Sequence, residues 1–193
     1  MRTTREHSLT RTGRVLLGLM LAAAMGTLAV RSARPAEIIP SIGMTRAVNG
    51  GDKVETYGSL GLRGNLVPMV KSEIGVAYRS ESRFDNTLTV KTWPITASLW
   101  LQPIPALYAG GGVGWYQITN DYDQSKIAFP IQDNTQSEFG VHLGGGLRVP
   151  LAPAAAIDLN GRYVMMREQE SPLIPQKFDP DFWTTSLGLA IGF

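Results

Sequence analysis

The chain has 193 residues, of which 44% are hydrophobic, and this length fits a single domain. It contains no cysteine, which excludes a disulfide framework, a thiolate metal site and a cysteine nucleophile. The formal charge of +2 depends on the first 36 residues, because six of the 18 basic residues and one of the 16 acidic residues lie there. The remainder carries 12 basic and 15 acidic residues, a net charge of −3, and gives no argument for nucleic-acid binding.

The first 36 residues have the pattern of an export signal. Four arginines in residues 1–14 precede an apolar run over residues 15–30. A basic head followed by a short apolar core is typical of a secretory signal peptide, whereas a membrane-anchoring helix needs about 20 apolar residues. We therefore expect a signal peptide over residues 1–36, cleaved between residues 29 and 36. Thr27 and Ala29 have suitably small side chains for cleavage, while Ala33 and Ala36 each follow an arginine by two positions.

The domain over residues 37–193 is expected to contain eight strands. Its apolar residues alternate with a period of two, and no stretch has a helical period. In chain order the predicted strands cover residues 38–48, 54–66, 70–79, 90–101, 107–118, 138–149, 155–165 and 182–193. The connections near 49–52, 68, 103 and 151 are short, whereas those at 80–87, 120–137 and 167–181 are longer and polar.

The last predicted strand has one large apolar face and one small face. Its odd positions include Trp183, Leu187, Leu189, Ile191 and Phe193, and its even positions are mostly threonine, serine, glycine and alanine. A transmembrane strand of a narrow barrel has this composition, because lipid contacts one face and a crowded lumen contacts the other. A soluble lipocalin-like barrel, the alternative, would carry charged residues on its outer face. An even number of strands also closes the sheet and leaves no open edge in lipid.

Aromatic residues support the same arrangement. Six of them fall on the apolar parity of their strands, close to the longer loops: Tyr78, Trp93, Trp115, Phe139, Tyr163 and Trp183. Aromatic girdles of this kind lie at the membrane interface of barrel proteins. We therefore expect these side chains to form a girdle on the side of the long loops.

Several segments have a distinctive composition: WPIT at 93–96, YAGGGVGW at 108–115 and FGVHLGGG at 139–146, together with Arg162-Tyr163 and the terminal Phe193. In these segments the chain resembles the small outer-membrane β-barrel domain family, which includes OmpX, OmpW and the membrane domain of OmpA. The resemblance implies an all-β, eight-stranded antiparallel up-and-down transmembrane barrel in the outer membrane of a Gram-negative cell. Its implied partners are outer-membrane lipid and the barrel assembly machinery. Leu187, Leu189, Ile191 and Phe193 would then be the C-terminal assembly signal.

The opposite parity carries charged residues that would face the lumen. We predict a structural charge network of Glu55, Arg63, Lys71, Glu73, Arg79, Glu138, His142, Arg148, Asp158 and Arg162. An eight-stranded barrel has an interior that its own side chains can fill, and buried charges are costly unless they pair. The favoured interpretation is a packed polar lumen, and the alternative is a selective pore.

No residue pattern predicts catalysis. His142 is the only histidine after the signal, and Glu138, four residues away along the same strand, is about 13 Å distant. Ser137 has the opposite parity, so we expect His142 to be a hydrogen-bonded lumen residue and predict no catalytic residue. The glycines at 110–114 are not followed by the helix that a nucleotide-binding loop needs, so they are expected to leave lumen space for bulky neighbours.

The sequence likewise predicts no metal site and no cofactor. Asp121 and Asp123 resemble the start of a calcium-binding loop, but Lys126 and Gln132 occupy the positions that need glycine and glutamate. Three functions therefore remain: a structural or surface-interaction barrel, a narrow channel for small and hydrophobic solutes, and, as the last of the three, an outer-membrane enzyme. The loop sequences do not identify an extracellular partner.

Overall fold

The computed structural model describes residues 36–48, 54–83, 87–126, 134–167, 169–171, 174–178 and 180–193. The chain divides into two units, Met1–Ala33 and Arg34–Phe193, and the second contains all of the described residues. The predicted signal peptide lies outside the described residues except for Ala36, and it stays a prediction. Over the described parts of the chain, no helix has the length and apolar character needed to cross a membrane.

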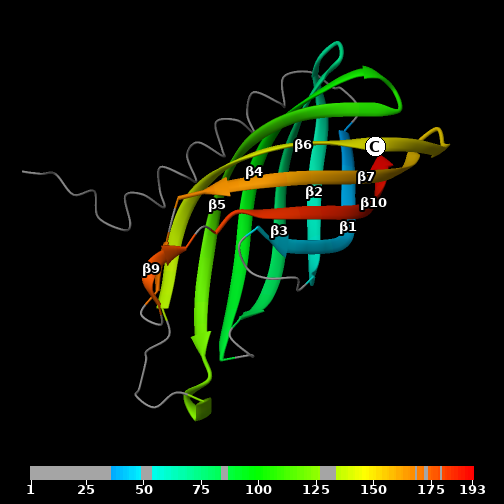
Figure 1. Cartoon of the computed structure of the whole chain (residues 1–193). Helices are drawn as coiled ribbons and strands as arrows, with labels where there is room; N and C mark the ends of the chain where they lie inside the picture. Colours follow the sequence, from blue (N-terminus) through cyan, green and yellow to red (C-terminus); the bar gives the residue numbers. More distant parts are fainter. Residues whose placement is uncertain are drawn as a thin grey trace, which may run out of the picture. The chain divides into compact units, whose positions relative to one another are not determined.

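Eight antiparallel strands form a closed barrel in up-and-down order (Figure 1). They are β1 (Ala36–Ala47), β2 (Glu55–Val67), β3 (Val70–Arg83), β4 (Leu88–Ile104), β5 (Leu107–Tyr122), β6 (Asn134–Ala152), β7 (Ala155–Met166) and β10 (Phe182–Gly192). A short 3-10 turn, η1 (Gln124–Lys126), follows β5, and a small separate hairpin, β8 (Gln169–Ser171) with β9 (Ile174–Phe178), precedes β10. The predicted eight-stranded meander is confirmed.

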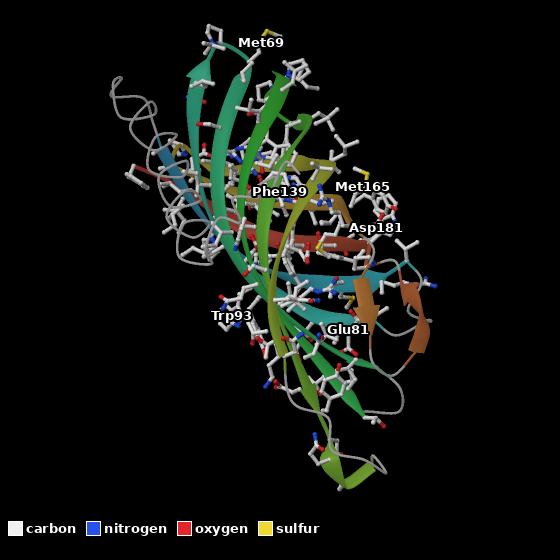
Figure 2. The ribbon with its side chains drawn as sticks, turned by 90° about the vertical axis from the view of Figure 1, so that its left-hand side faces the viewer. Met69, Glu81, Trp93, Phe139, Met165 and Asp181 are labelled. Carbon is white, nitrogen blue, oxygen red and sulfur yellow. The ribbon has the colours of Figure 1, made fainter. Side chains whose placement is uncertain are left out.

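The two ends of the barrel differ. The turn end carries the tight turns at 68–69, 105–106 and 153–154 together with Ala36 and Phe193, whose backbones exchange hydrogen bonds of 3.3 and 2.9 Å and close the sheet. Met69 adopts a left-handed conformation (φ 65°) in the first of these turns. The loop end carries the connections after β1, β3, β5 and β7. Figure 2 places Met69 at the turn end, well away from Glu81.

The strands nearest the middle of the chain reach further at the loop end than the sequence predicts. β3, β4, β5 and β6 have 14, 17, 16 and 19 residues, whereas β1, β2, β7 and β10 have 12, 13, 12 and 11. We call these four long strands the tall wall, and Figure 1 shows its β5 running on to η1. The added residues are mostly polar on the outward side, so a search for apolar alternation assigns them to loops. The hairpin β8–β9 was likewise predicted as loop.

The two faces of the barrel are inverted relative to a soluble protein. Leu143 on β6 is 61% exposed, whereas its neighbour His142 is 1% exposed. The same reversal holds on β2, where Leu62 is 51% exposed and Arg63 is 2% exposed. A closed barrel with apolar residues outside and charges inside is stable where lipid covers its outer face. The lipocalin-like alternative is therefore wrong.

Candidate functional site: the barrel lumen

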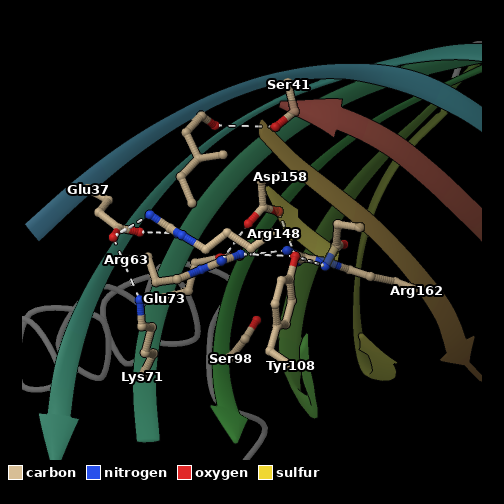
Figure 3. Close-up of polar contacts among 12 residues, drawn as sticks. Glu37, Ser41, Arg63, Lys71, Glu73, Ser98, Tyr108, Arg148, Asp158 and Arg162 are labelled. Atoms are coloured by element: carbon tan, nitrogen blue, oxygen red, sulfur yellow. Dashed lines mark hydrogen bonds and ion pairs between the residues drawn. The ribbon is translucent and has the colours of Figure 1, made fainter. Parts of the chain in front are cut away.

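A cluster of four charged side chains occupies the middle of the lumen (Figure 3). Arg63 is its hub, with Nη2 and Nε each 2.7 Å from Glu73 Oε2 and Nη1 2.7 Å from Asp158 Oδ2. Arg162 Nη2 lies 2.6 Å from the other oxygen of Glu73. We call Arg63, Glu73, Asp158 and Arg162 the central cluster. Two positive and two negative charges give it no net charge, which is the arrangement that buried ions require.

Polar and aromatic groups provide the remaining contacts of the central cluster. Tyr108 donates a 2.6 Å hydrogen bond to Asp158 Oδ1, and Asn160 joins Tyr108 to Arg162 through bonds of 2.9 and 2.8 Å. The Arg63 guanidinium lies 4.5 Å from the centre of the Tyr108 ring. Each carboxylate oxygen of Glu73 and Asp158 therefore accepts a hydrogen bond from a fixed donor. Charge-assisted bonds of this kind hold a side chain in one geometry.

Glycines make room for these contacts, as the sequence analysis expected. A Cβ at Gly146 would collide with the ring of Tyr108, and one at Gly114 would lie 2.6 Å from the ring of Tyr116. Gly112 stands between Ser98 and His142 in one row across β4, β5 and β6. The missing side chain lets Ser98 Oγ and His142 Nε2 meet at 2.9 Å. The glycines at 110–114 thus lie within a strand, and no helix follows to form a phosphate-binding loop.

Apolar side chains fill the lumen toward the loop end. This apolar plug consists of Leu88, Val90, Tyr116, Ile118, Tyr122, Val164 and Phe182, with Met166 against it. The ring of Phe182 lies under the guanidinium of Arg79 at 3.8 Å, and Arg79 also pairs with Glu81 at 2.9 Å. Leu88 and Tyr122 belong to the extension of the tall wall that the sequence assigned to loops. Apolar side chains of β4, β5, β7 and β10, together with the buried Arg79–Glu81 pair, therefore lie between the central cluster and the loop end.

Three charged residues form a second ionic group at the turn end. Arg148 binds Glu37 through both of its terminal nitrogens, at 2.6 and 2.7 Å. The Lys71 ammonium lies 3.6 Å from the same carboxylate. We call Glu37, Lys71 and Arg148 the turn-end group. Figure 3 shows Glu37 between the two cations.

The predicted lumen residues do not all meet. Arg63, Glu73, Asp158 and Arg162 come together, Lys71 and Arg148 lie in the turn-end group, and Arg79 lies at the loop end. Glu55 accepts a bond of 3.5 Å from the Ser82 amide. Within the described residues Glu138 has no ion pair, although it is on the predicted face.

Sequence reasoning missed four lumen partners: Glu37, Glu81, Tyr108 and Asn160. Tyr108 and Asn160 have the lumen parity of their strands, so a search for buried donors and acceptors could have found them. Glu37 had been placed at the boundary of the export signal, and Glu81 in a loop. Both residues belong to strands through their backbone pairing, but the sequence around them has no apolar alternation that would predict a strand.

Ser98 and His142 form a pair that the sequence does not predict, because they lie 44 positions apart in the chain. A serine and a histidine in contact are the beginning of a nucleophilic site. Here His142 Nδ1 has no partner among the described residues, so no carboxylate orients the ring. Ser98 and His142 are 4% and 1% exposed, and Trp100 packs beside them. The pair lacks both the third group and the access to substrate that catalysis requires.

The predicted girdle residues lie on the outward face. Tyr78 packs on Trp93 and Tyr163 packs on Trp183, each pair with ring centres 4.5 Å apart. Trp115 and Phe139 are cross-strand partners on β5 and β6. Trp93 and Trp183 are each 55% exposed, which places their rings against the surroundings of the barrel. Among the terminal residues, Leu187, Leu189, Ile191 and Phe193 are also outward and exposed.

The free space in the middle of the described lumen is small. A cavity of about 40 Å³ lies beside the central cluster, and its lining includes Ser59, Glu73, His142, Asn160 and Arg162 together with apolar side chains. A water molecule needs about 10–15 Å³ of such space, so the cavity holds a few waters and no solute. No group of three or more histidine, aspartate or glutamate residues in the described ranges could hold a metal ion. The lumen is built as a packed core.

This fold is that of the small outer-membrane β-barrels. OprG from Pseudomonas aeruginosa superimposes with a TM-score of 0.59 at 13% identity, over 83% of this chain and 96% of that one. Ail, the attachment invasion locus protein of Yersinia pestis, gives 0.55 at 16% identity over 84% and 100%. Neisserial surface protein A gives 0.55 at 10% identity over 84% and 98%. No protein-family model and no curated protein matches the chain by sequence.

Proposed function

We propose that this chain is a non-enzymatic outer-membrane barrel that acts at the cell surface through the loop end of its tall wall. The observation that carries the proposal is the packed lumen. The central cluster, the apolar plug and the turn-end group occupy it in three layers, so the interior offers stability and no path for solutes. What remains for interaction is the outer surface beyond the girdle, where loops on a rigid scaffold are free to bind.

The chemistry of the tall wall fits a surface role. Beyond the girdle its outward face carries hydroxyl, amide and charged groups, including Thr119 and Thr135 with their hydroxyls 3.2 Å apart and the Lys91–Asp121 ion pair at 2.5 Å. This polar sheet stands beyond the lipid-facing band, because the apolar outward residues end at Trp93 and Phe139. Two of the structural neighbours are described as an attachment protein and a surface protein, which supports the same role here.

A shortened hairpin tests this function. Removing residues 119–135 and joining Ile118 to Gln136 through Asn-Gly keeps the register of β5 and β6, because Ile118 and Gln136 are cross-strand partners. We expect the variant to assemble as a barrel that still migrates faster before boiling than after it on a detergent gel. Cells that carry it should lose adherence to surfaces coated with extracellular matrix or sulfated glycan, relative to cells with the full chain. Ail has been crystallised with a heparin analogue, which makes sulfated glycan a reasonable first probe. Equal adherence of both cell types would refute the surface role.

One observation favours the narrow channel as a second candidate. Pro40 has no amide hydrogen, and the ladder between β1 and β10 is interrupted between Ile38 and Ser41. An apolar groove of about 440 Å³ lies over this break on the outward face, and it shares Ser41 and Ser59 with the internal cavity. A small hydrophobic solute could use this thin part of the wall. Flux of such a solute into vesicles should then fall in Ser59→Phe, and unchanged flux would exclude this route.

A further inference from the structure

The turn end of the lumen opens into a vestibule that no part of the proposed function uses. Its volume is about 400 Å³, and its walls include Asn65, Met69, Lys71, Gln102, Ile104 and Arg148. Lys71 and Asn65 are direct cross-strand partners on β3 and β2, so their side chains lie side by side. Cationic, amide and apolar groups therefore share one open cavity.

The charges in this vestibule do not balance. Arg148 holds both oxygens of Glu37 in a bidentate pair at 2.6 and 2.7 Å, which uses the one carboxylate of the turn-end group. Lys71 is 3.6 Å from Glu37, beyond the length of a good hydrogen bond. Two cations face one anion, and the excess positive charge lies on Lys71, whose side chain is 17% exposed.

The layer beneath cannot supply the missing anion. Glu73 gives one oxygen to Arg63 and the other to Arg162. Asp158 gives one oxygen to Arg63 and the other to Tyr108. Both carboxylates of the central cluster are thus engaged, and its net charge is zero. A largely buried ammonium that shares a single carboxylate with an arginine favours a further anion from outside, because incomplete pairing of a buried charge is costly.

We propose that the vestibule binds a singly charged oxyanion, a carboxylate or a phosphodiester, with Lys71 as its main ligand. Asn65 stands beside Lys71 and supplies an amide donor, whereas the amide of Gln102 is already bound to the carbonyl of Pro105 at 2.7 Å. Met69 and Ile104, 56% and 49% exposed, offer apolar contact to the carbon part of the ligand. Such an anion comes either from solution or from the headgroup of a neighbouring phospholipid. Glu37 is an internal competitor for the same cations.

Titration of the full barrel in maltoside micelles, whose headgroup carries no phosphate, tests the site. Sodium acetate and dimethyl phosphate are added separately at constant ionic strength, and the backbone amide signals of Lys71 and Asn65 are followed by NMR. We expect saturable shifts in the unmodified protein, at least tenfold weaker binding in Lys71→Met, and several-fold tighter binding in Glu37→Gln. Lys126→Met, in η1 at the opposite end of the barrel, should bind as the unmodified protein does.

The source of the anion is distinguished by the surrounding lipid. In nanodiscs containing phosphatidylglycerol, a lipid headgroup in the vestibule would weaken the apparent affinity for acetate, whereas a site for soluble anions would keep the micelle value. Equal acetate affinity in the unmodified protein and Lys71→Met would overturn the proposal. So would unchanged affinity in Glu37→Gln, a variant that keeps the side-chain shape and therefore serves even if Lys71→Met folds poorly.

Discussion

Replacing the hub of the central cluster, Arg63→Met, should destabilise the barrel by about 3 kcal/mol. Arg63 is 2% exposed and holds one oxygen each of Glu73 and Asp158 at 2.7 Å. Removing one partner of a buried ion pair costs about 3–5 kcal/mol, because the remaining charge stays buried without compensation. We expect the lower end of that range, since Glu73 keeps Arg162 and Asp158 keeps Tyr108.

The free energy of unfolding can be measured by urea titration of the protein refolded in lipid vesicles, with tryptophan fluorescence and the heat-dependent gel shift as two readouts. Arg148→Met is the matched control, because it removes an arginine whose partner, Glu37, keeps a second cation, Lys71, at 3.6 Å. The Glu37 carboxylate therefore stays paired, so this change should cost about 1 kcal/mol or less. A loss below about 1 kcal/mol in Arg63→Met, or equal losses in the two variants, would show that the central cluster does not stabilise the lumen.

Three further changes have distinct expected outcomes. Gly114→Val should reduce folding yield, because its side chain would occupy the space of the Tyr116 ring, and the fraction of heat-modifiable protein measures this. Asp181→Ala should increase proteolysis near residue 170 while the barrel stays intact. Asp181 accepts hydrogen bonds of 2.8 Å from the Tyr163 hydroxyl and the Met166 amide, at the base of the β8–β9 connection. Unchanged proteolysis would contradict this prediction. Deletion of Phe193 should lower outer-membrane levels of the protein, because its backbone closes the sheet against Ala36; normal levels would contradict this.

Parity along each strand indicated the lumen side for Arg63, Glu73 and Asp158, but it missed Glu37 and Glu81 and did not predict which side chains pair. Arg148 and Asp158 stand directly opposite each other on β6 and β7, and a sequence-based pairing would join them. Instead Arg148 reaches Glu37, 111 positions away in the chain, and Asp158 binds Arg63 across the barrel. A long arginine side chain can reach several strands in a narrow lumen, so its partner depends on the shear of the barrel. A single sequence does not contain that quantity.

The fold was accessible from sequence because lipid imposes a strong pattern on the outward face. Trp93, Leu99 and Leu101 on β4 alternate with lumen residues such as Ser98, and that period ends where lipid ends. Beyond the girdle water replaces lipid, and the outward residues become polar without leaving the sheet. Lys91 and Thr89 continue β4 to Leu88, although their composition resembles a loop. The sequence therefore underestimates the length of the tall wall at its loop end, which is the end to which the proposed function assigns binding.

The order of the layers explains why the lumen is closed toward the loop end and open at the turn end. Beneath the loop end, Phe182 and Tyr116 meet edge to face with ring centres 6.2 Å apart, and the one ion pair described at this level, Arg79 with Glu81, is buried and packs on Phe182. At the turn end, Glu37 and Arg148 leave a vestibule of about 400 Å³ in contact with solvent. A solute that entered there would meet the paired charges of Arg63 and Asp158 and then an apolar layer. Breaking the ion pairs alone would consequently leave the second barrier in place, so Arg63→Met should lose stability without gaining conductance in a planar bilayer.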